Sequence, residues 1–256
     1  MKNILVVFLV LIVSTCFGQK ELKKLKKAYE AKSQSQLESF LQQWQSESTP
    51  LTSLDSLSDL QKDAYLIYMD FYNPYNLNRV GEAEMDDSSY VGIDYVIIQN
   101  SIPTTTYKAD TLDASVFKNK DSLKLSSEKI KNFRPDIQFE QAKALYLFPK
   151  YSKAINKFLG SKSYPLGFGG IMSPSSARGE SAERLKFLNE RVRILHGHWG
   201  GYWHIETHPF IYGIDFNQSR TEAIVSFRLG YEGGVAFYEK NNGKWELTVS
   251  RIKWIE

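Results

Sequence analysis

Five runs near the C-terminus decide the fold: YWHIET at 202–207, FIYGIDF at 210–216, EAIVSFRLGY at 222–231, VAFYE at 235–239 and KWELTVSRIKWI at 244–255. They are rich in β-branched and aromatic residues, which is typical of strands. Turn-forming residues separate them, and Asn242–Gly243 is a strong hairpin signal because both residues tolerate positive φ. Successive strands joined by short turns predict an antiparallel sheet.

The last run predicts that this sheet is curved, because its large apolar residues change face partway along. Three share one face and two share the other: Trp245, Leu247 and Val249, then Ile252 and Trp254. A β-bulge near Ser250 or Arg251 would restore a common face and bend the sheet. With a helix expected from Ser181 to about Leu195, region 180–256 is predicted to be a curved antiparallel sheet preceded by a helix.

The N-terminal region, 19–89, predicts a pair of helices. Apolar residues recur at helical spacing from 20 to about 45, and a second helix is expected to begin at the capping box Ser58–Gln61 and to end before Pro74. Lysines crowd the first turns, at Lys20, Lys23, Lys24, Lys26 and Lys27. We interpret them as a solvated helix face in preference to a contact with an anionic membrane surface or partner.

The middle region, 90–179, is expected to mix strands, a short helix and loop. Its strand candidates are 90–99, 104–107, 115–117 and 144–148. A helix is expected from Pro149 to Gly160, followed by a loop rich in Gly, Ser and Pro over 161–179. This region either forms one domain with 180–256 or stands apart from it. The sequence therefore predicts an α+β fold.

Residues 1–18 predict a secretory signal peptide. Lys2 gives a positive charge, Ile4–Val13 is an unbroken apolar run, and cleavage is expected after Gly18. The run is too short for a membrane-spanning helix, which needs roughly 20 residues. In the alternative, Cys16 carries the lipid anchor of a lipoprotein. A periplasmic or secreted location is predicted, and the single cysteine excludes a disulfide within the chain.

Composition excludes some classes of partner. The chain has 32 basic and 29 acidic residues, and this near balance implies no nucleic-acid-binding role. After the signal, no apolar stretch approaches transmembrane length. We expect no cofactor, and we expect the partner to be a small molecule or another envelope protein.

Histidines are concentrated in one short segment, at His196, His198, His204 and His208. On an extended strand, His204, Glu206 and His208 would project from one face, so they are candidate metal ligands and, with Asp215, candidate catalytic residues. A two-residue turn at 200–201 would separate His198 from the face of His204, whereas a loop one residue longer would let the two histidine sets converge. The spacing matches no zinc signature, which favours packing as their role.

Candidate ligand contacts lie in the same part of the chain. Trp199 and Trp203 could stack on a sugar or peptide, although buried aromatic anchors beside a tight turn are more common. Arg228 and Tyr231, in the run at 222–231, are the other candidate ligand-binding residues.

Residues 181–256 resemble the nuclear-transport-factor-2-like superfamily. The resemblance rests on a helix followed by strands, on 210–216 turning into 221–225, and on the closing segment 242–247. It implies a cone-shaped α+β fold whose bent sheet encloses a pocket. The superfamily includes isomerases and dehydratases as well as non-enzymatic binding modules, and no catalytic residue can be carried across.

No nucleophile with a recognisable base and orienting group stands out in the sequence. We therefore expect an exported soluble protein that binds a ligand or a partner without catalysis. The alternative is an enzyme, either metal-assisted or an acid/base hydrolase or isomerase, that uses the cluster from His196 to His208.

Overall fold

The structure is a computed structural model that describes residues 18–81, 87–160, 179–197 and 203–255. It is an α+β fold, as predicted, and it divides into two compact units that are interleaved along the chain. Unit 1 comprises 1–49, 93–98 and 139–206, and unit 2 comprises 50–92, 99–138 and 207–256. Each unit draws on all three regions distinguished in the sequence. The predicted signal peptide at 1–18 lies outside the described residues, apart from Gly18.

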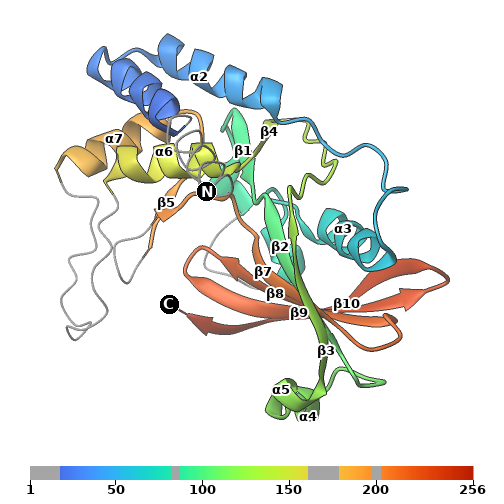
Figure 1. Cartoon of the computed structure of the whole chain (residues 1–256). Coiled ribbons are helices and arrows are strands. Elements are labelled where there is room, and N and C mark those ends of the chain that lie inside the picture. The colour runs from blue at the N-terminus through green and yellow to red at the C-terminus, as the bar shows by residue number, and fades with distance from the viewer. Residues whose placement is uncertain (1–17, 82–86, 161–178, 198–202, 256) are drawn as a thin grey trace, which may run out of the picture. The chain divides into compact units, whose positions relative to one another are not determined.

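Unit 1 packs helices against two short strand pairs (Figure 1). Its elements are helix 18–30, α2 (Gln34–Glu47), β1 (Tyr95–Ile98), β4 (Lys143–Tyr146), α6 (Pro149–Leu159), α7 (Glu180–Leu188), β5 (Leu195–His196) and β6 (Trp203–His204). The pair β1–β4 is parallel and the pair β5–β6 is antiparallel. In its core, buried Trp44 donates from Nε1 to the Tyr146 carbonyl at 2.8 Å and stacks on the ring of Tyr151.

The continuous helix expected from 20 to about 45 is in fact two helices. Lys32 has a φ of 48°, a left-handed conformation that an α-helix cannot contain. Ser33 then caps α2 by accepting a hydrogen bond from the backbone of its first turn. The helix expected to reach about Leu195 also ends early, at Leu188, and Leu195 lies in β5.

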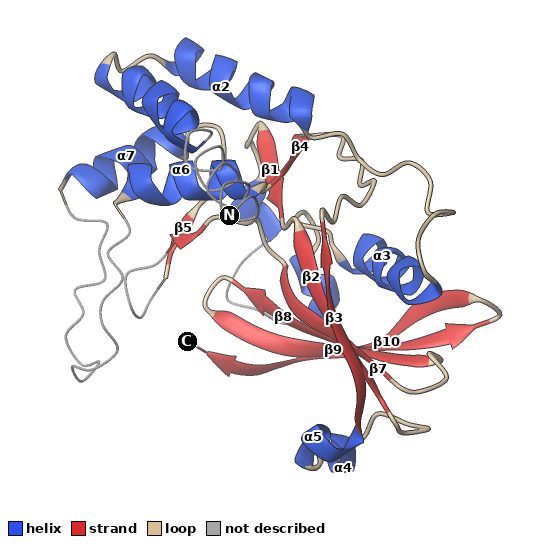
Figure 2. Cartoon of the chain, viewed as in Figure 1, coloured by secondary structure: helices blue, strands red, loops and turns tan. Residues whose placement is uncertain are grey.

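Unit 2 contains one six-stranded sheet with α3 (Asp59–Phe71) against one of its faces (Figure 2). The strands are β2 (Ser101–Tyr107), β3 (Lys124–Lys131), β7 (Phe210–Phe216), β8 (Glu222–Leu229), β9 (Glu232–Asn241) and β10 (Lys244–Ile255), in the order β10-β9-β8-β7-β2-β3. Four short helical segments complete the unit: η1 (Leu77–Val80), η2 (Asp87–Tyr90), α4 (Ala114–Lys118) and α5 (Lys120–Leu123). Strands β7 to β10 are antiparallel, as predicted, whereas β2 and β7 are parallel.

The two faces of this sheet differ in what covers them. Side chains alternate along β8, so Phe227 points toward α3, where its ring lies 5.1 Å from that of Phe71. Ile224 and Arg228 point to the opposite face, which we call the open face. Around Ile224 the open face is covered by an apolar cluster that includes Leu112 and, from α4, Val116.

Several local predictions are confirmed. Ser58 caps α3 with a complete capping box, and the helix ends at Phe71, before Pro74. Helix α6 begins at Pro149 and is stopped by Gly160 in the left-handed conformation. The hairpin at Asn242–Gly243 has φ values of 51° and 82°, as its sequence requires.

Strand β10 carries two register shifts, one on each side of the expected bulge. The shifts lie between Leu247 and Val249 and between Ile252 and Trp254, not at Ser250 or Arg251. They divide the apolar residues of the strand between the faces: Trp245, Leu247 and Ile252 share the face of α3, and Val249 and Trp254 lie on the open face.

Two further predictions are wrong. The strand candidate at 115–117 lies in α4, because the Asp113 carboxylate caps the backbone N–H groups of Ser115 and Val116. Gly233 and Gly234 fall between the predicted strand runs 222–231 and 235–239, which predicts a turn there, but they lie inside β9, and the chain turns at 230–231 instead.

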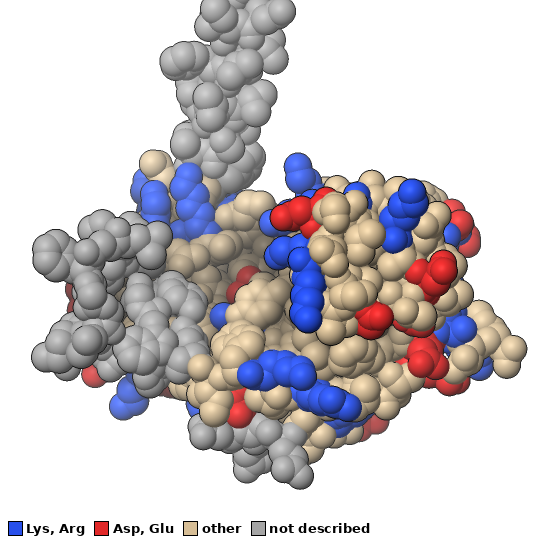
Figure 3. All heavy atoms as spheres, turned by 90° about the horizontal axis from the view of Figure 1, so that it is seen from below, with Lys and Arg blue, Asp and Glu red and all other residues tan. Residues whose placement is uncertain are grey.

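Within the described residues, no helix has both the length and the apolar character needed to cross a bilayer. On the face drawn in Figure 3, basic and acidic side chains occur together, in keeping with the balanced composition.

Candidate functional site

The open face aligns residues from neighbouring strands. Arg228 on β8 lies opposite Phe210 on β7 and Gly233 on β9, and Gly233 lies opposite Trp254 on β10. Four residues earlier on β8, Ile224 lies opposite Asp215. The face therefore carries a cation and a carboxyl group separated by about 13 Å, at roughly 3.3 Å per residue along a strand.

Three aromatic rings form a connected group with Arg228, and we call the set Phe210, Tyr212, Arg228 and Trp254 the Arg228 patch. The guanidinium carbon of Arg228 lies 5.2 Å from the ring centroid of Phe210 and 5.8 Å from that of Tyr212, within the range of cation–π contacts. The ring of Trp254 lies 6.4 Å from that of Tyr212. Tyr212 is 41% exposed and Trp254 is 42% exposed, so solvent reaches the patch.

Two backbone features build the Arg228 patch. A Cβ atom on Gly233 would lie 2.0 Å from the Trp254 ring, so only glycine lets the indole rest against β9. The register of β7 and β8 shifts between Ile211 and Gly213, which makes Tyr212 the extra residue of a bulge. Such bulges redirect a side chain, and here the redirected tyrosine lies beside Arg228.

Arg228 is buried but poorly paired. Its side chain is only 7% exposed, and among the described residues its single polar contact is a marginal hydrogen bond of 3.5 Å from Nη1 to the Tyr212 hydroxyl. Among the described residues, the Nε of Arg228 has no hydrogen-bond partner, and no carboxylate lies within ion-pairing distance of the guanidinium. Since a guanidinium offers five N–H donors, most of its hydrogen-bonding capacity is left for a ligand.

Asp215 is the second polar feature of the open face. Burial raises the pKa of its carboxyl group to about 6, while a hydrogen bond from Thr105 and the charge of Lys120 act in the opposite direction. The apolar cluster around Ile224 borders this carboxyl group, and the charge of Asp215 in turn contributes to the raised pKa of Tyr107. A carboxyl group with such a pKa can take up or release a proton near neutral pH.

His196 and His204, the described histidines of unit 1, do not converge. His196 pairs with Trp203, and His204 pairs with Leu195, so the side chains of His196 and His204 lie on opposite faces of the β5–β6 ladder. The ring of His196 packs edge-on against Trp203. His198 lies outside the described residues.

The proposed metal ligands are divided between the units: His204 and Glu206 belong to unit 1, and His208 belongs to unit 2. His208 is fully buried, and its Nδ1 accepts a hydrogen bond of 2.7 Å from the Gly230 backbone, so that this nitrogen carries no proton. Throughout the described ranges, no group of three His, Cys, Asp or Glu side chains is placed to hold a metal ion.

The other predicted ligand contacts have different surroundings. Trp203 is buried in the core of unit 1, as expected of a packing residue. Tyr231 is 37% exposed in the turn that follows β8. Trp199 lies outside the described residues.

Unit 1 also has a charged recess of about 350 Å³ between α2, the start of β1 and the segment before β4. Arg191 forms an ion pair of 2.5 Å with Asp94 there, and the Tyr95 hydroxyl donates to Glu38 at 2.7 Å. Burial, together with that hydrogen bond, raises the pKa of Tyr95. These groups largely satisfy one another, in contrast to Arg228.

Arg228 and Asp215 are among the site residues predicted from the sequence, whereas Phe210, Tyr212 and Trp254 are not. One signal pointed to Arg228, namely a charged residue within the apolar run at 222–231. Comparison with protein-family models, with curated proteins and with solved structures gave no match to this chain. The site itself is therefore the evidence for function.

Proposed function

We propose that the protein is an exported, non-catalytic binding module that holds a small ligand on the open face of its six-stranded sheet. The observation that carries this proposal is the buried Arg228 guanidinium, which lacks an acidic partner among the described residues. A buried charge without a counter-charge costs several kcal/mol. A ligand with an anionic group would offset that cost on binding.

The surroundings of Arg228 define the class of ligand. A carboxylate can accept two parallel hydrogen bonds from a guanidinium, which gives both energy and orientation. The flanking rings of Tyr212 and Trp254 favour a flat or apolar body attached to that carboxylate. We therefore propose a ligand that joins a carboxylate to an aromatic or sugar ring.

Arg228→Gln is expected to abolish the preference for an anionic ligand. With phenylacetate and its neutral analogue phenylacetamide as probes, the unmodified protein should bind the acid about tenfold more tightly, since hydrogen bonds to charged groups contribute about 1.5–3 kcal/mol. The variant should bind both probes equally weakly. Tryptophan fluorescence titration measures this, because Trp254 belongs to the patch.

Arg251→Gln is the matched control, because Arg251 is exposed on the same face and the substitution removes the same charge. It should leave the preference for phenylacetate unchanged. A preference that survives Arg228→Gln, or that is lost equally in both variants, contradicts the proposal.

Acid–base catalysis is a second candidate function, and the raised pKa of Asp215 is the observation that favours it. Here the proposed catalytic residues are Asp215 and Thr105, because His196 and His204 lie on opposite faces of the β5–β6 ladder. Turnover of a bound substrate that follows a titration near pH 6 and is lost in Asp215→Asn would support it.

Asp215→Asn is also expected to change how stability depends on pH. The pKa of Asp215 is raised from 3.8 to about 6, so between these values the folded chain keeps a proton that the unfolded chain releases. The contribution of Asp215 to stability is therefore greatest below pH 4 and falls as the pH rises to 6. At pH 7.5 the variant should be about 1 kcal/mol more stable than the unmodified protein, and at pH 4 nearly equal. Urea unfolding at both pH values measures this.

The control for this prediction is Asp136→Asn, which changes an exposed carboxyl group. It should leave the pH dependence intact. Equal stability of Asp215→Asn and the unmodified protein at every pH would show that burial does not disfavour the ionised form.

We further propose that residues 1–18 are removed during export and that the C-terminal sheet is of the nuclear-transport-factor-2-like kind. The apolar run Ile4–Val13 supports the first proposal, and a curved antiparallel sheet with one open face supports the second. The intact mass of the exported protein distinguishes cleavage after Gly18 from a lipid attached at Cys16.

A further inference from the structure

Helix 18–30 has two chemically different sides. One side is anchored in the core of unit 1, where Glu21, Leu25 and Ala28 are buried. The other side carries lysines at three-, four- and seven-residue spacing, which places them together on the helix surface: Lys20, Lys23, Lys24 and Lys27. Because the buried side fixes the helix, these lysines are held on a rigid support.

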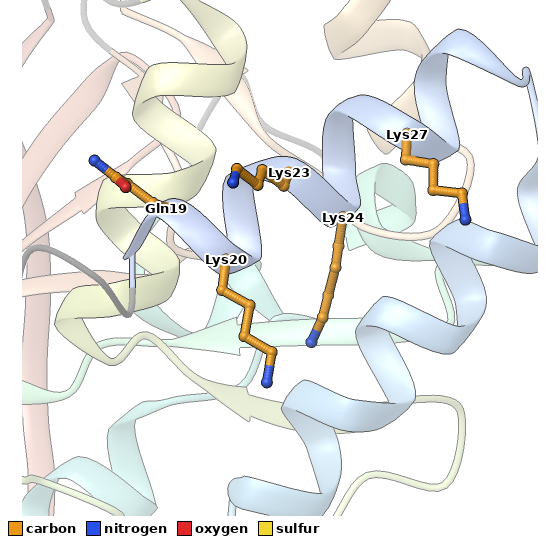
Figure 4. A pocket seen from close by; sticks show the side chains of 5 residues that line it. All are labelled: Gln19, Lys20, Lys23, Lys24 and Lys27. Atoms are coloured by element: carbon orange, nitrogen blue, oxygen red, sulfur yellow. The ribbon is translucent and has the colours of Figure 1, made fainter.

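The lysines line a hollow of about 370 Å³, together with Gln19 (Figure 4). We call it the lysine hollow. Figure 4 shows the side chains of Lys20 and Lys24 extending to the same side of the helix. The lining is mainly aliphatic, because it is formed by the lysine stems, and each stem ends in an ammonium group.

Few acidic groups compensate this charge. Lys24 pairs with Glu21 at 3.3 Å and also donates to Gln43 of α2. Lys20, Lys23 and Lys27 form no ion pair with any described residue. Like charges three and four residues apart on a helix repel one another, so the cluster attracts an anion despite the balanced charge of the whole chain.

We infer that the lysine hollow binds a phosphate group. A terminal phosphate carries close to two negative charges near neutral pH and has several acceptor oxygens. The phosphodiester of a lipid head group carries one charge, but a membrane surface presents many such groups side by side. Each lysine supplies three donors from a compact charge, so several ammonium groups can contact one phosphate. A carboxylate has one charge and two oxygens and would leave more of this cluster uncompensated. The phosphate can come from a free phosphorylated molecule or from an anionic lipid head group.

The test uses two probes with the unmodified protein. Pyrophosphate is titrated calorimetrically in low-salt chloride buffer, and co-sedimentation is measured with vesicles of phosphatidylglycerol and phosphatidylcholine, against vesicles of phosphatidylcholine alone. Binding of pyrophosphate only identifies a free phosphate ligand, and binding that requires phosphatidylglycerol identifies a head group. Either result supports the inference, and the absence of both overturns it.

The variant Lys20→Gln/Lys23→Gln/Lys27→Gln should weaken this binding at least tenfold. Its matched control removes three equally exposed lysines from unit 2: Lys118→Gln/Lys129→Gln/Lys131→Gln. The control should change affinity less than twofold. An equal loss in both variants would mean that only overall charge matters, and this would overturn the inference. Unchanged thermal melting of the variants separates loss of binding from loss of folding.

Discussion

Asp63→Ala is expected to lower the free energy of unfolding by about 3 kcal/mol, because breaking a buried ion pair leaves its partners uncompensated. Asp63 is buried on α3, and its carboxylate accepts hydrogen bonds from Lys240 at 2.6 Å and from Trp245 Nε1 at 2.9 Å. It also lies 3.8 Å from Arg220. One side chain thus links α3 to both β9 and β10. Urea unfolding followed by far-ultraviolet circular dichroism measures the effect.

Asp63→Asn separates the contribution of the negative charge from that of the hydrogen bond with Trp245. The amide oxygen can still accept the hydrogen bond from Trp245, but it no longer balances the charge of Lys240, so we expect a loss of about 2 kcal/mol. Asp59→Asn is the matched control, because Asp59 lies on the same helix with 76% of its side chain exposed and 3.5 Å from Arg220. Exposed pairs contribute at most about 1 kcal/mol. Equal losses in Asp63→Asn and Asp59→Asn would contradict this account.

Gly234→Ala is expected to destabilise the protein by about 3 kcal/mol, a large effect of the kind that overpacking produces. A Cβ atom at this position would lie 2.4 Å from the carbonyl oxygen of Arg251 and 2.7 Å from the ring of Phe227. The first of these is backbone of β10, so strands β9 and β10 must move apart. Urea unfolding again measures the loss.

Gly233→Ala gives the contrasting result from the neighbouring position. The three atoms nearest to its Cβ atom all belong to the ring of Trp254, which is partly exposed at the end of β10 and can rotate away. We expect a stability loss below about 1 kcal/mol, together with displacement of Trp254 from the Arg228 patch and weaker binding of phenylacetate. If Gly233→Ala is as destabilising as Gly234→Ala, the indole of Trp254 is fixed more firmly than its exposure indicates.

The sequence allowed prediction of those elements that depend on local chemistry. The runs at 210–216 and 244–255 became β7 and β10 because their alternating apolar residues and the Asn242–Gly243 turn act over short distances. Strand β3 was missed because most of its residues are exposed, and its conformation depends on pairing with β2. The parallel pairs β1–β4 and β2–β7 join distant segments and leave no local signal.

The candidate site was only partly predictable for a related reason. Arg228 stands out in an apolar strand, but its aromatic neighbours come from other strands, and their approach depends on a bulge at Tyr212 and on the side-by-side alignment of Gly233 and Trp254. The histidines show the opposite case. Although close in sequence, His204 and His208 belong to different compact units, because the unit boundary falls between Glu206 and Thr207.

The interleaving of the two units has a consequence for how the chain acquires its structure during synthesis. The chain passes between the units at 49–50, 92–93, 98–99, 138–139 and 206–207, so neither unit is complete until its last segment has left the ribosome. Strand β1 cannot form its parallel pair until β4 has been synthesised, and β2 cannot form its parallel pair until β7 has been synthesised. Such long-range pairing slows folding. A nascent chain of this kind stays unfolded for longer, which is the state that a secretory channel accepts, in accord with the export proposed from its first eighteen residues.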